Sequence, residues 1–167
     1  MGLDPHSMNV VFALERFRMK YPEWRLKHAR KLVNEIILSK IKESMAEAGY
    51  HEKVIRETRV RDVTVDAQGT ITYQIVSDYT TDDGFNVGDA MEDGTRRHFV
   101  APRFRKALRW GNVKWIFSKG HFVRGIRRHK IIERTIRRRT AMLQRALDKD
   151  TDLLFYEMVG NAGNTGR

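Results

Sequence analysis

Length, composition and charge indicate a soluble globular protein. The 167 residues are the length of one ordinary domain, with 41% hydrophobic and 32% charged residues. The composition excludes collagen-like and disulfide-scaffold classes, and the absence of cysteine excludes thiolate nucleophiles and cysteine-ligated zinc. No apolar run approaches the roughly 18 residues of a transmembrane helix, and no secretory signal opens the chain, so we expect no membrane partner. Residues 1–7 are interpreted as an expression-vector remnant outside the fold.

The net charge of +11 is concentrated in one part of the chain. Residues 96–147 hold 17 of the 32 Lys and Arg but only one of the 21 Asp and Glu, which leaves +16 there and −5 in the remainder. A basic face of this size attracts phosphate backbones, acidic membranes or acidic protein partners. A solvated arginine-rich helix with no specific partner stays open as the alternative.

Two helical segments are predicted before residue 50. Residues 8–19 are interpreted as a short amphipathic helix or arm, which we expect to break at Tyr21-Pro22 because proline disfavours helical geometry in the residue before it. A long helix then begins at Pro22 and ends at Gly49. Its buried face is predicted from apolar residues at three- and four-residue steps: Leu26, Ala29, Val33, Ile36, Ile37, Ile41 and Met45.

A β-hairpin is predicted next. Residues 54–66, in which Val63 and Val65 alternate with polar neighbours, form its first strand, and residues 70–79 form its second. Residues 66–69 form the turn, because Gly69 can take the positive φ that such turns need.

Residues 80–94 are predicted to be an acidic surface loop. The loop contains no Lys or Arg and five acids, Asp82, Asp83, Asp89, Glu92 and Asp93. Their spacing fails the EF-hand pattern, so a calcium site is the weaker alternative. We expect this loop to be mobile in the isolated protein and to order on a partner.

Three short strands and a long helix complete the predicted fold. The strands cover residues 97–102, 103–110 and 112–118, where core packing of Trp110, Trp115 and Phe117 is favoured over the stacking of nucleic-acid bases. The helix covers residues 121–148, with a stripe formed by Ile132, Ile136, Leu143 and Leu147 and flanked by Ile131, Thr135, Met142 and Ala146. A short further helix is expected at residues 150–158, and residues 159–167 are expected to be a disordered tail.

The predicted architecture is a single α+β domain at residues 8–158. In it, a long N-terminal helix and a long basic C-terminal helix accompany an antiparallel sheet of about four to five strands.

The sequence carries no recognisable catalytic or metal-binding motif. Phosphate-cradling glycine loops, two-histidine zinc helices and serine elbows are absent, so we expect no enzyme, no metal and no cofactor. The alternative is a small basic RNase, in which His98 and His121 would be the acid and base on an arginine cradle for phosphate.

Residues 91–102 read Met-Glu-Asp-Gly-Thr-Arg-Arg-His-Phe-Val-Ala-Pro, a run that resembles a segment of the tail-completion (neck) proteins of long-tailed bacteriophages. In that family a Glu-x-Gly-Thr turn leads to a His and then a Pro. A Lys-Ala-Leu-x-aromatic strand and an apolar strand ending in Lys follow. The positions that match here are Glu92, Gly94, Thr95, His98, Pro102, Lys106, Ala107, Leu108, Trp110 and Lys119.

The resemblance covers about thirty residues in motif, and most of the chain in the order of its predicted elements. The chain departs from the family at residues 121–126, which lack the usual His-Pro-Gly-Thr stretch. The resemblance implies a viral structural protein of the head–tail junction that assembles as a ring around the DNA channel. Its partners would be other copies, head–tail connector proteins and tail-tube proteins, in the virion neck or tail and in the host cytoplasm during assembly.

Acidic and basic residues of one chain are suited to head-to-tail contacts that close such a ring. The candidate subunit-interface or phosphate-facing residues are Asp82, Asp83, Asp89, Arg127, Arg128, Arg134, Arg137 and Arg138. Non-specific contact of the basic residues with DNA stays open beside this interpretation. The alternative function is a basic nucleic-acid-binding protein, with or without the RNase activity of a toxin.

Overall fold

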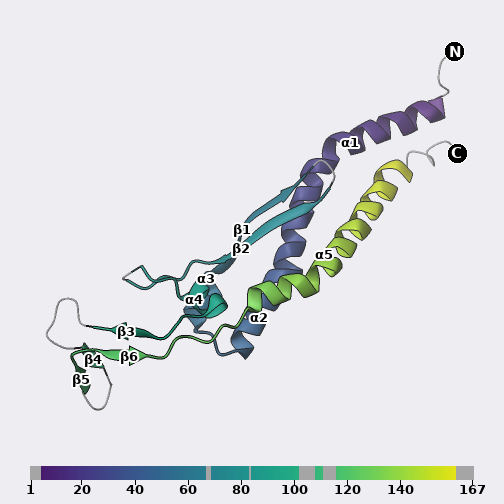
Figure 1. The fold of residues 1–167 in the computed structure, drawn as a ribbon. Helices are drawn as coiled ribbons and strands as arrows, with labels where there is room; N and C mark the ends of the chain where they lie inside the picture. Colours follow the sequence, from purple (N-terminus) through teal and green to yellow (C-terminus); the bar gives the residue numbers. More distant parts are fainter. Residues whose placement is uncertain (1–4, 67–68, 83, 102–107, 111–115, 161–167) are drawn as a thin grey trace. The chain divides into compact units, whose positions relative to one another are not determined.

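The computed structural model describes residues 5–66, 69–82, 84–101, 108–110 and 116–160. The chain is mixed α+β and divides into two compact units. Unit 1 consists of Met1–Asp78 with Ile131–Arg167, and unit 2 consists of Tyr79–Lys130. Unit 1 holds the long N-terminal helix, a β-hairpin and the C-terminal helix, and unit 2 holds a short helix and two small ladders (Figure 1). The extent of a single domain at residues 8–158 stays a prediction.

The N-terminal helix of unit 1 does not break at Pro22, so the predicted boundary there is wrong. Helix α1 runs over Pro5–Leu32, and the π-helical turn η1 (Val33–Leu38) and helix α2 (Ser39–Glu47) continue it before Gly49. Proline in a helix interior costs roughly 3 kcal/mol. Tertiary contacts on both sides of it offset that cost: Phe17 meets the ring of Phe155 edge-to-face at 5.5 Å, and Ala29 is fully buried.

The π-helical turn keeps one row of side chains in the core. Ala29, Val33, Ile37, Ile41 and Met45 recur at uniform four-residue steps, and all are 0% exposed. In an ideal α-helix each such step drifts by about 40° around the axis, so a row of five would leave the core. The wider turn at Val33–Leu38 offsets the drift in the middle of the row. The predicted buried face is therefore confirmed for these five residues.

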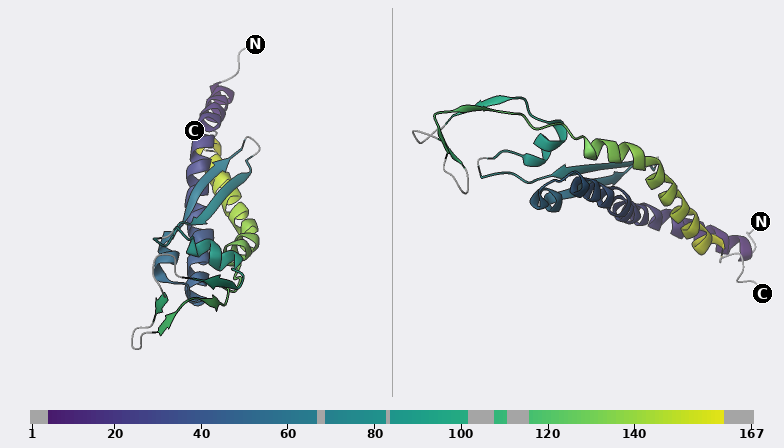
Figure 2. Two further views of the ribbon diagram at one scale, coloured as in Figure 1. Left: turned by 60° about the vertical axis from the view of Figure 1, so that its left-hand side comes forward. Right: turned by 90° about the horizontal axis from the view of Figure 1, so that it is seen from below.

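Helix α5 (Ile131–Phe155) packs against the long N-terminal helix that carries this buried row. It runs alongside α1, η1 and α2, and the π-helical turn η2 (Tyr156–Gly160) continues it (Figure 2). Thr135, Leu143 and Leu147 are its buried residues, whereas the predicted core member Met142 is 51% exposed. Two boundaries are corrected, because α5 begins at Ile131 rather than residue 121 and no separate helix begins at residue 150. Residues 161–167, the larger part of the predicted tail, lie outside the described residues.

The predicted hairpin is confirmed, with a later start. Residues 54–57, expected in its first strand, belong to helix α3 (Glu52–Glu57), and strand β1 (Thr58–Val65) pairs antiparallel with β2 (Ile71–Ser77). A bulge between Val60 and Asp62 makes two consecutive residues face outward, so that Val60 and Val63 can both face the helices. Buried Thr58 donates to the carbonyl of Val54 at 2.8 Å, which satisfies its hydroxyl.

The end of the hairpin is fixed to α1 by Arg25. Gly69 has a φ of +83°, as the predicted turn requires, and its carbonyl accepts a 2.8 Å hydrogen bond from Arg25 Nη2. Arg25 also donates to the hydroxyl of Tyr21, one helical turn away. The hairpin is therefore held at both ends, by Arg25 at its turn and by α3 at its base.

Unit 2 contains more helix and smaller sheets than predicted. Residues 80–94 are not a plain loop, because helix α4 spans Val87–Asp93 and an isolated bridge joins Thr80 to Asn86. Strand β3 (His98–Val100) pairs with β6 (His121–Val123), and β4 (Leu108–Trp110) pairs with β5 (Ile116–Ser118). The predicted sheet of four to five strands is wrong: across the part of the chain that the structure describes, six strands form three separate two-stranded sheets.

The buried row predicts a sharp difference between two neighbouring isoleucines. Ile37→Ala removes a side chain that is 0% exposed and should lower the free energy of unfolding by about 3 kcal/mol. Ile36→Ala removes the same atoms from a half-buried position and should cost about 1 kcal/mol. Urea unfolding followed by circular dichroism measures both, and equal losses would contradict the assigned core row.

Candidate functional site

The family-motif residues at positions 92–95 form a clasp in unit 2. The Asn86 side chain caps the first turn of α4, where the amide of Asp89 donates to it at 3.0 Å. After α4 the Thr95 amide donates to the Ile126 carbonyl at 3.0 Å, and the Ile126 amide donates back to Thr95 Oγ1 at 2.8 Å. Two further bonds run from the amides of His129 and Lys130 to the carbonyls of Met91 and Glu92, at 3.1 and 3.2 Å.

Two glycines allow the two segments of the clasp, residues 91–95 and 125–130, to approach this closely. Gly94 ends α4 with a φ of +75°, and a Cβ there would lie 2.9 Å from the Ile126 carbonyl oxygen. A Cβ on Gly125 would overlap the carbonyl group of Thr95. The Glu-x-Gly-Thr motif thus has a structural role here, because it ties the end of α4 to the segment that leads to α5.

The β3–β6 ladder presents two aromatic rings. Phe99 and Phe122 pair across it, 53% and 60% exposed, and their rings meet edge-to-face with centroids 5.1 Å apart. Phe99 lies directly over Gly120, where a Cβ would collide with its ring. The Arg97 guanidinium covers the ring of Phe122 at 4.8 Å from its centroid. The two exposed rings therefore contact each other, Gly120 and Arg97.

The β3–β6 ladder also contains the two histidines of the predicted acid–base pair, His98 and His121. His98 pairs with Val123 and Val100 pairs with His121, so positions 98 and 121 share one face of the ladder as diagonal neighbours. His98 is exposed and its Nδ1 lies 3.0 Å from the Arg96 carbonyl. The side chain of His121 lies outside what the structure describes.

Of the remaining motif positions, the structure describes three: Leu108, Trp110 and Lys119. Leu108 and Trp110 belong to β4 and pair with Ser118 and Ile116, and Lys119 is exposed directly after β5. The predicted packing of Trp110, Trp115 and Phe117, together with Pro102, Lys106 and Ala107, lies outside the described residues and side chains.

The predicted interface residues are divided between the units: the three acids lie in unit 2 with Arg127 and Arg128, whereas the other three arginines lie in unit 1. Asp82 and Asp89 are exposed in unit 2, and Asp83 lies outside the described residues. Arg128 meets Asp93 at 3.4 Å, but side-chain exposures of 54% and 77% make this ion pair weak. In unit 2, Arg127 is exposed, as are Arg134, Arg137 and Arg138 on α5 in unit 1. None of these four arginines has an acidic partner within 4.0 Å among the residues the structure describes.

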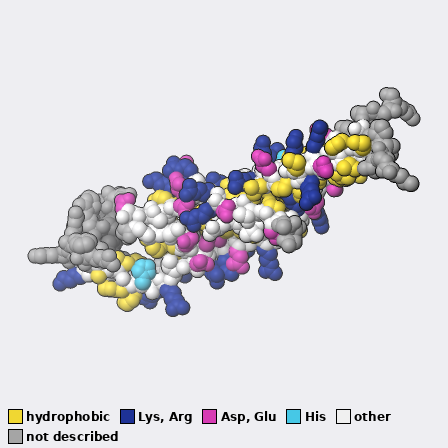
Figure 3. Space-filling model, turned by 90° about the horizontal axis from the view of Figure 1, so that it is seen from above, with side chains coloured by type: hydrophobic (Ala, Val, Ile, Leu, Met, Phe, Trp, Pro, Cys, Tyr) yellow, Lys and Arg dark blue, Asp and Glu magenta, His cyan; other side chains and the backbone are white. Residues whose placement is uncertain are grey.

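The sequence interpretation missed that several large apolar side chains toward the N-terminal part of α1 and the end of α5 are exposed, interspersed with charged ones (Figure 3). Met19 is 81% exposed, Phe12 53%, Leu153 58% and Tyr156 70%. The edge-to-face contact of Phe17 with Phe155 joins the two helices. What we call the apolar surface is the set of these exposed residues around the two helices, rather than one face: Met8, Val11, Phe12, Leu14, Met19, Leu153, Phe155 and Tyr156. The run of apolar residues at 10–17 was the available signal, but periodicity alone does not tell core from interface.

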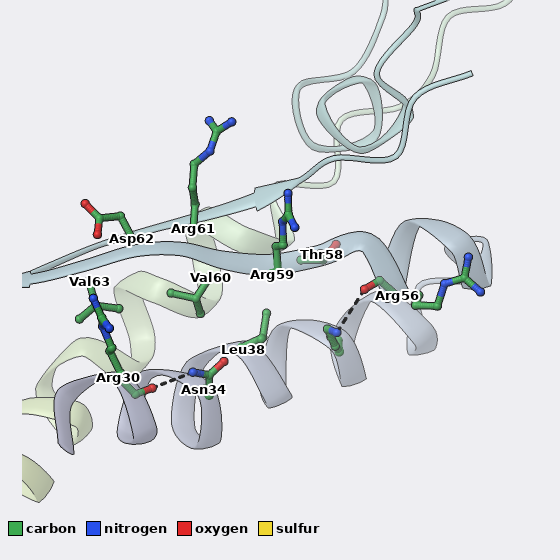
Figure 4. A pocket seen from close by; sticks show the side chains of 11 residues that line it. Arg30, Asn34, Leu38, Arg56, Thr58, Arg59, Val60, Arg61, Asp62 and Val63 are labelled. Atoms are coloured by element: carbon green, nitrogen blue, oxygen red, sulfur yellow. Dashed lines mark hydrogen bonds between the residues drawn. The ribbon is translucent and has the colours of Figure 1, made fainter. Parts of the chain in front are cut away.

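A groove of about 430 Å³ runs beside β1 and was also missed. Its helical wall consists of Arg30, Asn34, Leu38 and Lys42, and its other wall is residues 58–63 of β1. Val60 and Leu38 point toward each other inside it, whereas Arg61 and Asp62 point away from the helix (Figure 4). The groove brings together no acid, base and nucleophile that could act jointly.

The described residues meet the requirements of neither a metal site nor a membrane-spanning helix. Its described residues include no group of three or more His, Asp or Glu that could hold a metal ion. No helix among them has the length and apolar character needed to cross a bilayer. The chain matches no known protein family, no curated protein and no solved structure.

The clasp predicts that Gly125 is intolerant of any side chain. Gly125→Ala should lower the hydrogen-exchange protection of the Thr95 and Lys130 amides at least about tenfold, because the Cβ forces the two segments apart. Gly160→Ala is the control, since Gly160 has no left-handed φ and a Cβ there meets only the Tyr156 ring at 4.0 Å, and it should leave both amides protected. Protection at β1 and β2 should be unchanged in both variants. Unaltered protection in Gly125→Ala would contradict the clasp.

Proposed function

We propose that this chain is a structural protein of a viral head–tail junction, a tail-completion or neck protein that assembles with copies of itself as a ring around the DNA channel. Its further partners are head–tail connector and tail-tube proteins, in the virion neck or tail and in the host cytoplasm during assembly. The proposal includes no enzymatic step and no cofactor.

The apolar surface is the observation that carries this proposal. Eight large apolar side chains, each at least 39% exposed, gather at the ends of two helices that touch one another. Apolar area exposed in one part of a soluble protein favours an interaction there. A protein that works only in an assembly has a reason to expose them, because neighbouring copies cover them.

The resemblance at residues 91–119 gives this assembly its viral setting. The motif residues Glu92, Gly94 and Thr95 are used here as scaffold, in the clasp that holds α4 against residues 126–130. A structural role for the motif agrees with a protein whose task is to hold surfaces in position rather than to catalyse.

Self-association should depend on the apolar surface. We expect the weight-average mass of the wild-type chain to rise with concentration, and the double variant Met19→Ser, Leu153→Ser to stay monomeric, because it loses two of the most exposed apolar side chains. Met142→Ser is the control, since Met142 is 51% exposed on α5 outside this surface. Sedimentation velocity measures all three. A wild-type chain that stays monomeric, or a control that dissociates equally, would count against the proposal.

A second candidate function is nucleic-acid binding, which the exposed arginines of α5 favour. Arg134, Arg137 and Arg138 are exposed within two helical turns and have no acidic partner within 4.0 Å in the described chain, so they are available to phosphates.

Duplex binding at two salt concentrations separates the two functions. The junction proposal expects weak binding, whereas a dedicated binder would bind tightly as a monomer and lose affinity with a log–log salt slope of about 0.9 per phosphate contacted. Arg134→Glu with Arg138→Glu should reduce whatever binding is present, and Lys31→Glu with Lys53→Glu, which lowers the net charge by the same amount at exposed positions outside α5, is the control. Fluorescence anisotropy with a labelled duplex makes the measurement, and tight, steeply salt-dependent binding by a monomer would favour the second function.

A further inference from the structure

The groove beside β1 combines an apolar floor with basic side chains around it (Figure 4). Val60 of β1 and Leu38 of η1 point toward each other inside it, and both are half-buried. Among the residues that the structure describes, none from β2 or α5 lines the groove, so it lies along β1 rather than beneath the whole hairpin. Its volume of about 430 Å³ is in the range of natural binding sites.

The charge of the groove is strongly positive. Five of its lining residues are Lys or Arg, and the single acid, Asp62, points away from the helix. Two of the five cations already have acidic partners, since Arg59 meets Asp78 at 2.7 Å and Arg56 meets Glu57 at 3.3 Å. The other three have no acidic partner within 4.0 Å in the described chain: Arg30, Lys42 and Arg61. These three leave positive charge open to an anionic ligand.

The unpaired cations are spread along the groove rather than gathered at one point. On the helical wall, Arg30 and Lys42 lie at the two ends of a row with four-residue steps, about 18 Å apart along the helix axis. Arg61 belongs to the opposite wall. A single phosphate or carboxylate cannot meet both ends of this row. An extended polypeptide, which rises about 3.3 Å per residue, reaches both ends with about five or six residues.

We propose that this groove binds an extended acidic segment of a partner protein, with carboxylates at the cations and an apolar side chain on Val60 and Leu38. In the described chain β1 pairs with β2 alone, so the other edge of β1 offers backbone groups to such a segment. The inference goes beyond the proposed function and does not depend on ring assembly.

The segment belongs to a different protein rather than to a second copy. The clustered acids of the described chain are already in helices, residues 89–93 in α4 and residues 148–152 in α5. A helical segment cannot lie extended along the groove without unfolding, and α5 contributes Leu147 to the core of unit 1.

Charges on an edge strand also have a protective use, because they discourage pairing between sheets. Arg59 and Arg61, together with the bulge between Val60 and Asp62, fit that use. Protection of an edge does not require cations on the neighbouring helix, however, and Arg30 and Lys42 lie on that second wall. The presence of cations on both walls is what points to a ligand.

Nucleic acid is the rival polyanion for this groove. Proteins that bind single strands combine basic residues with aromatic side chains on which the bases stack. None of the lining residues in the described chain is aromatic, and the floor formed by Val60 and Leu38 is aliphatic. An acidic peptide that carries an apolar side chain matches both the charge and the floor of the groove.

Fluorescence anisotropy with a labelled peptide tests this site. The Glu probe is the peptide Glu-Glu-Leu-Glu-Ser-Glu, and the Gln probe replaces each Glu by Gln. We expect the wild-type chain to bind the Glu probe at least tenfold more tightly than the Gln probe, because only carboxylates attract the cations. Arg30→Glu with Arg61→Glu should weaken binding of the Glu probe at least tenfold. Arg16→Glu with Arg18→Glu is the control, since it makes the same change in net charge at exposed positions outside the groove, and it should bind like wild type.

Two substitutions of Asn34 keep the test decisive if the double arginine variant folds poorly. Asn34 is exposed on the helical wall, four residues from Arg30 and four from Leu38. Asn34→Asp retains the shape of the side chain, adds a negative charge and should weaken binding of the Glu probe several-fold. Asn34→Lys should strengthen it several-fold. Changes in the same direction would contradict the assigned site.

Four other results would overturn the inference. A wild-type chain that binds neither probe, or both equally, has no site for acidic peptides. Equal losses in the groove variant and its control would assign binding to the charge of the whole molecule. If labelled oligo(dT) binds, loses its affinity in the groove variant, and the Glu probe does not bind, the groove serves nucleic acid. Loss of self-association by the groove variant in sedimentation velocity would make the occupant a second copy. In each case the proposed function stands, because its test depends on the apolar surface.

Discussion

The contact between the buried row of the N-terminal helix and α5 holds unit 1 together. Ala29, Val33, Ile37, Ile41 and Met45 are completely shielded from solvent, and the buried residues of α5 lie against the same helix. This contact helps to keep α1 continuous past Pro22. The inner face of the hairpin packs against the same two helices. The long helix, the hairpin and α5 are therefore parts of one packing arrangement.

Apolar residues outside that arrangement explain why the chain is interpreted as part of an assembly. The helices extend beyond the shared core, and their ends expose Phe12, Met19, Leu153 and Tyr156. In unit 2 the sheets stop at two strands and leave Phe99 uncovered. Burial of apolar area is the main favourable term in association as in folding, so the proposed assembly would bury side chains that the chain itself leaves exposed.

The residues that carry the resemblance to tail-completion proteins have a physical reason to be where they are. Gly94 turns the chain at the end of α4, and Thr95 then bonds twice to Ile126. Residues 121–126, where the resemblance fails, provide the other side of this clasp through Gly125 and Ile126, because only a glycine at position 125 leaves room for the Thr95 carbonyl.

The sequence by itself determined the elements whose signals are local. Four-residue apolar steps identified the buried row, and Gly69 with the alternation of Val63 and Val65 identified the hairpin, because side-chain periodicity and turn geometry act over a few residues. Only the tertiary structure decided the continuity past Pro22, the π-helical turn, the two-stranded sheets and the exposure of residues such as Phe12. Each depends on what a segment finds to pack against from elsewhere in the chain, and periodicity carries no information about that partner.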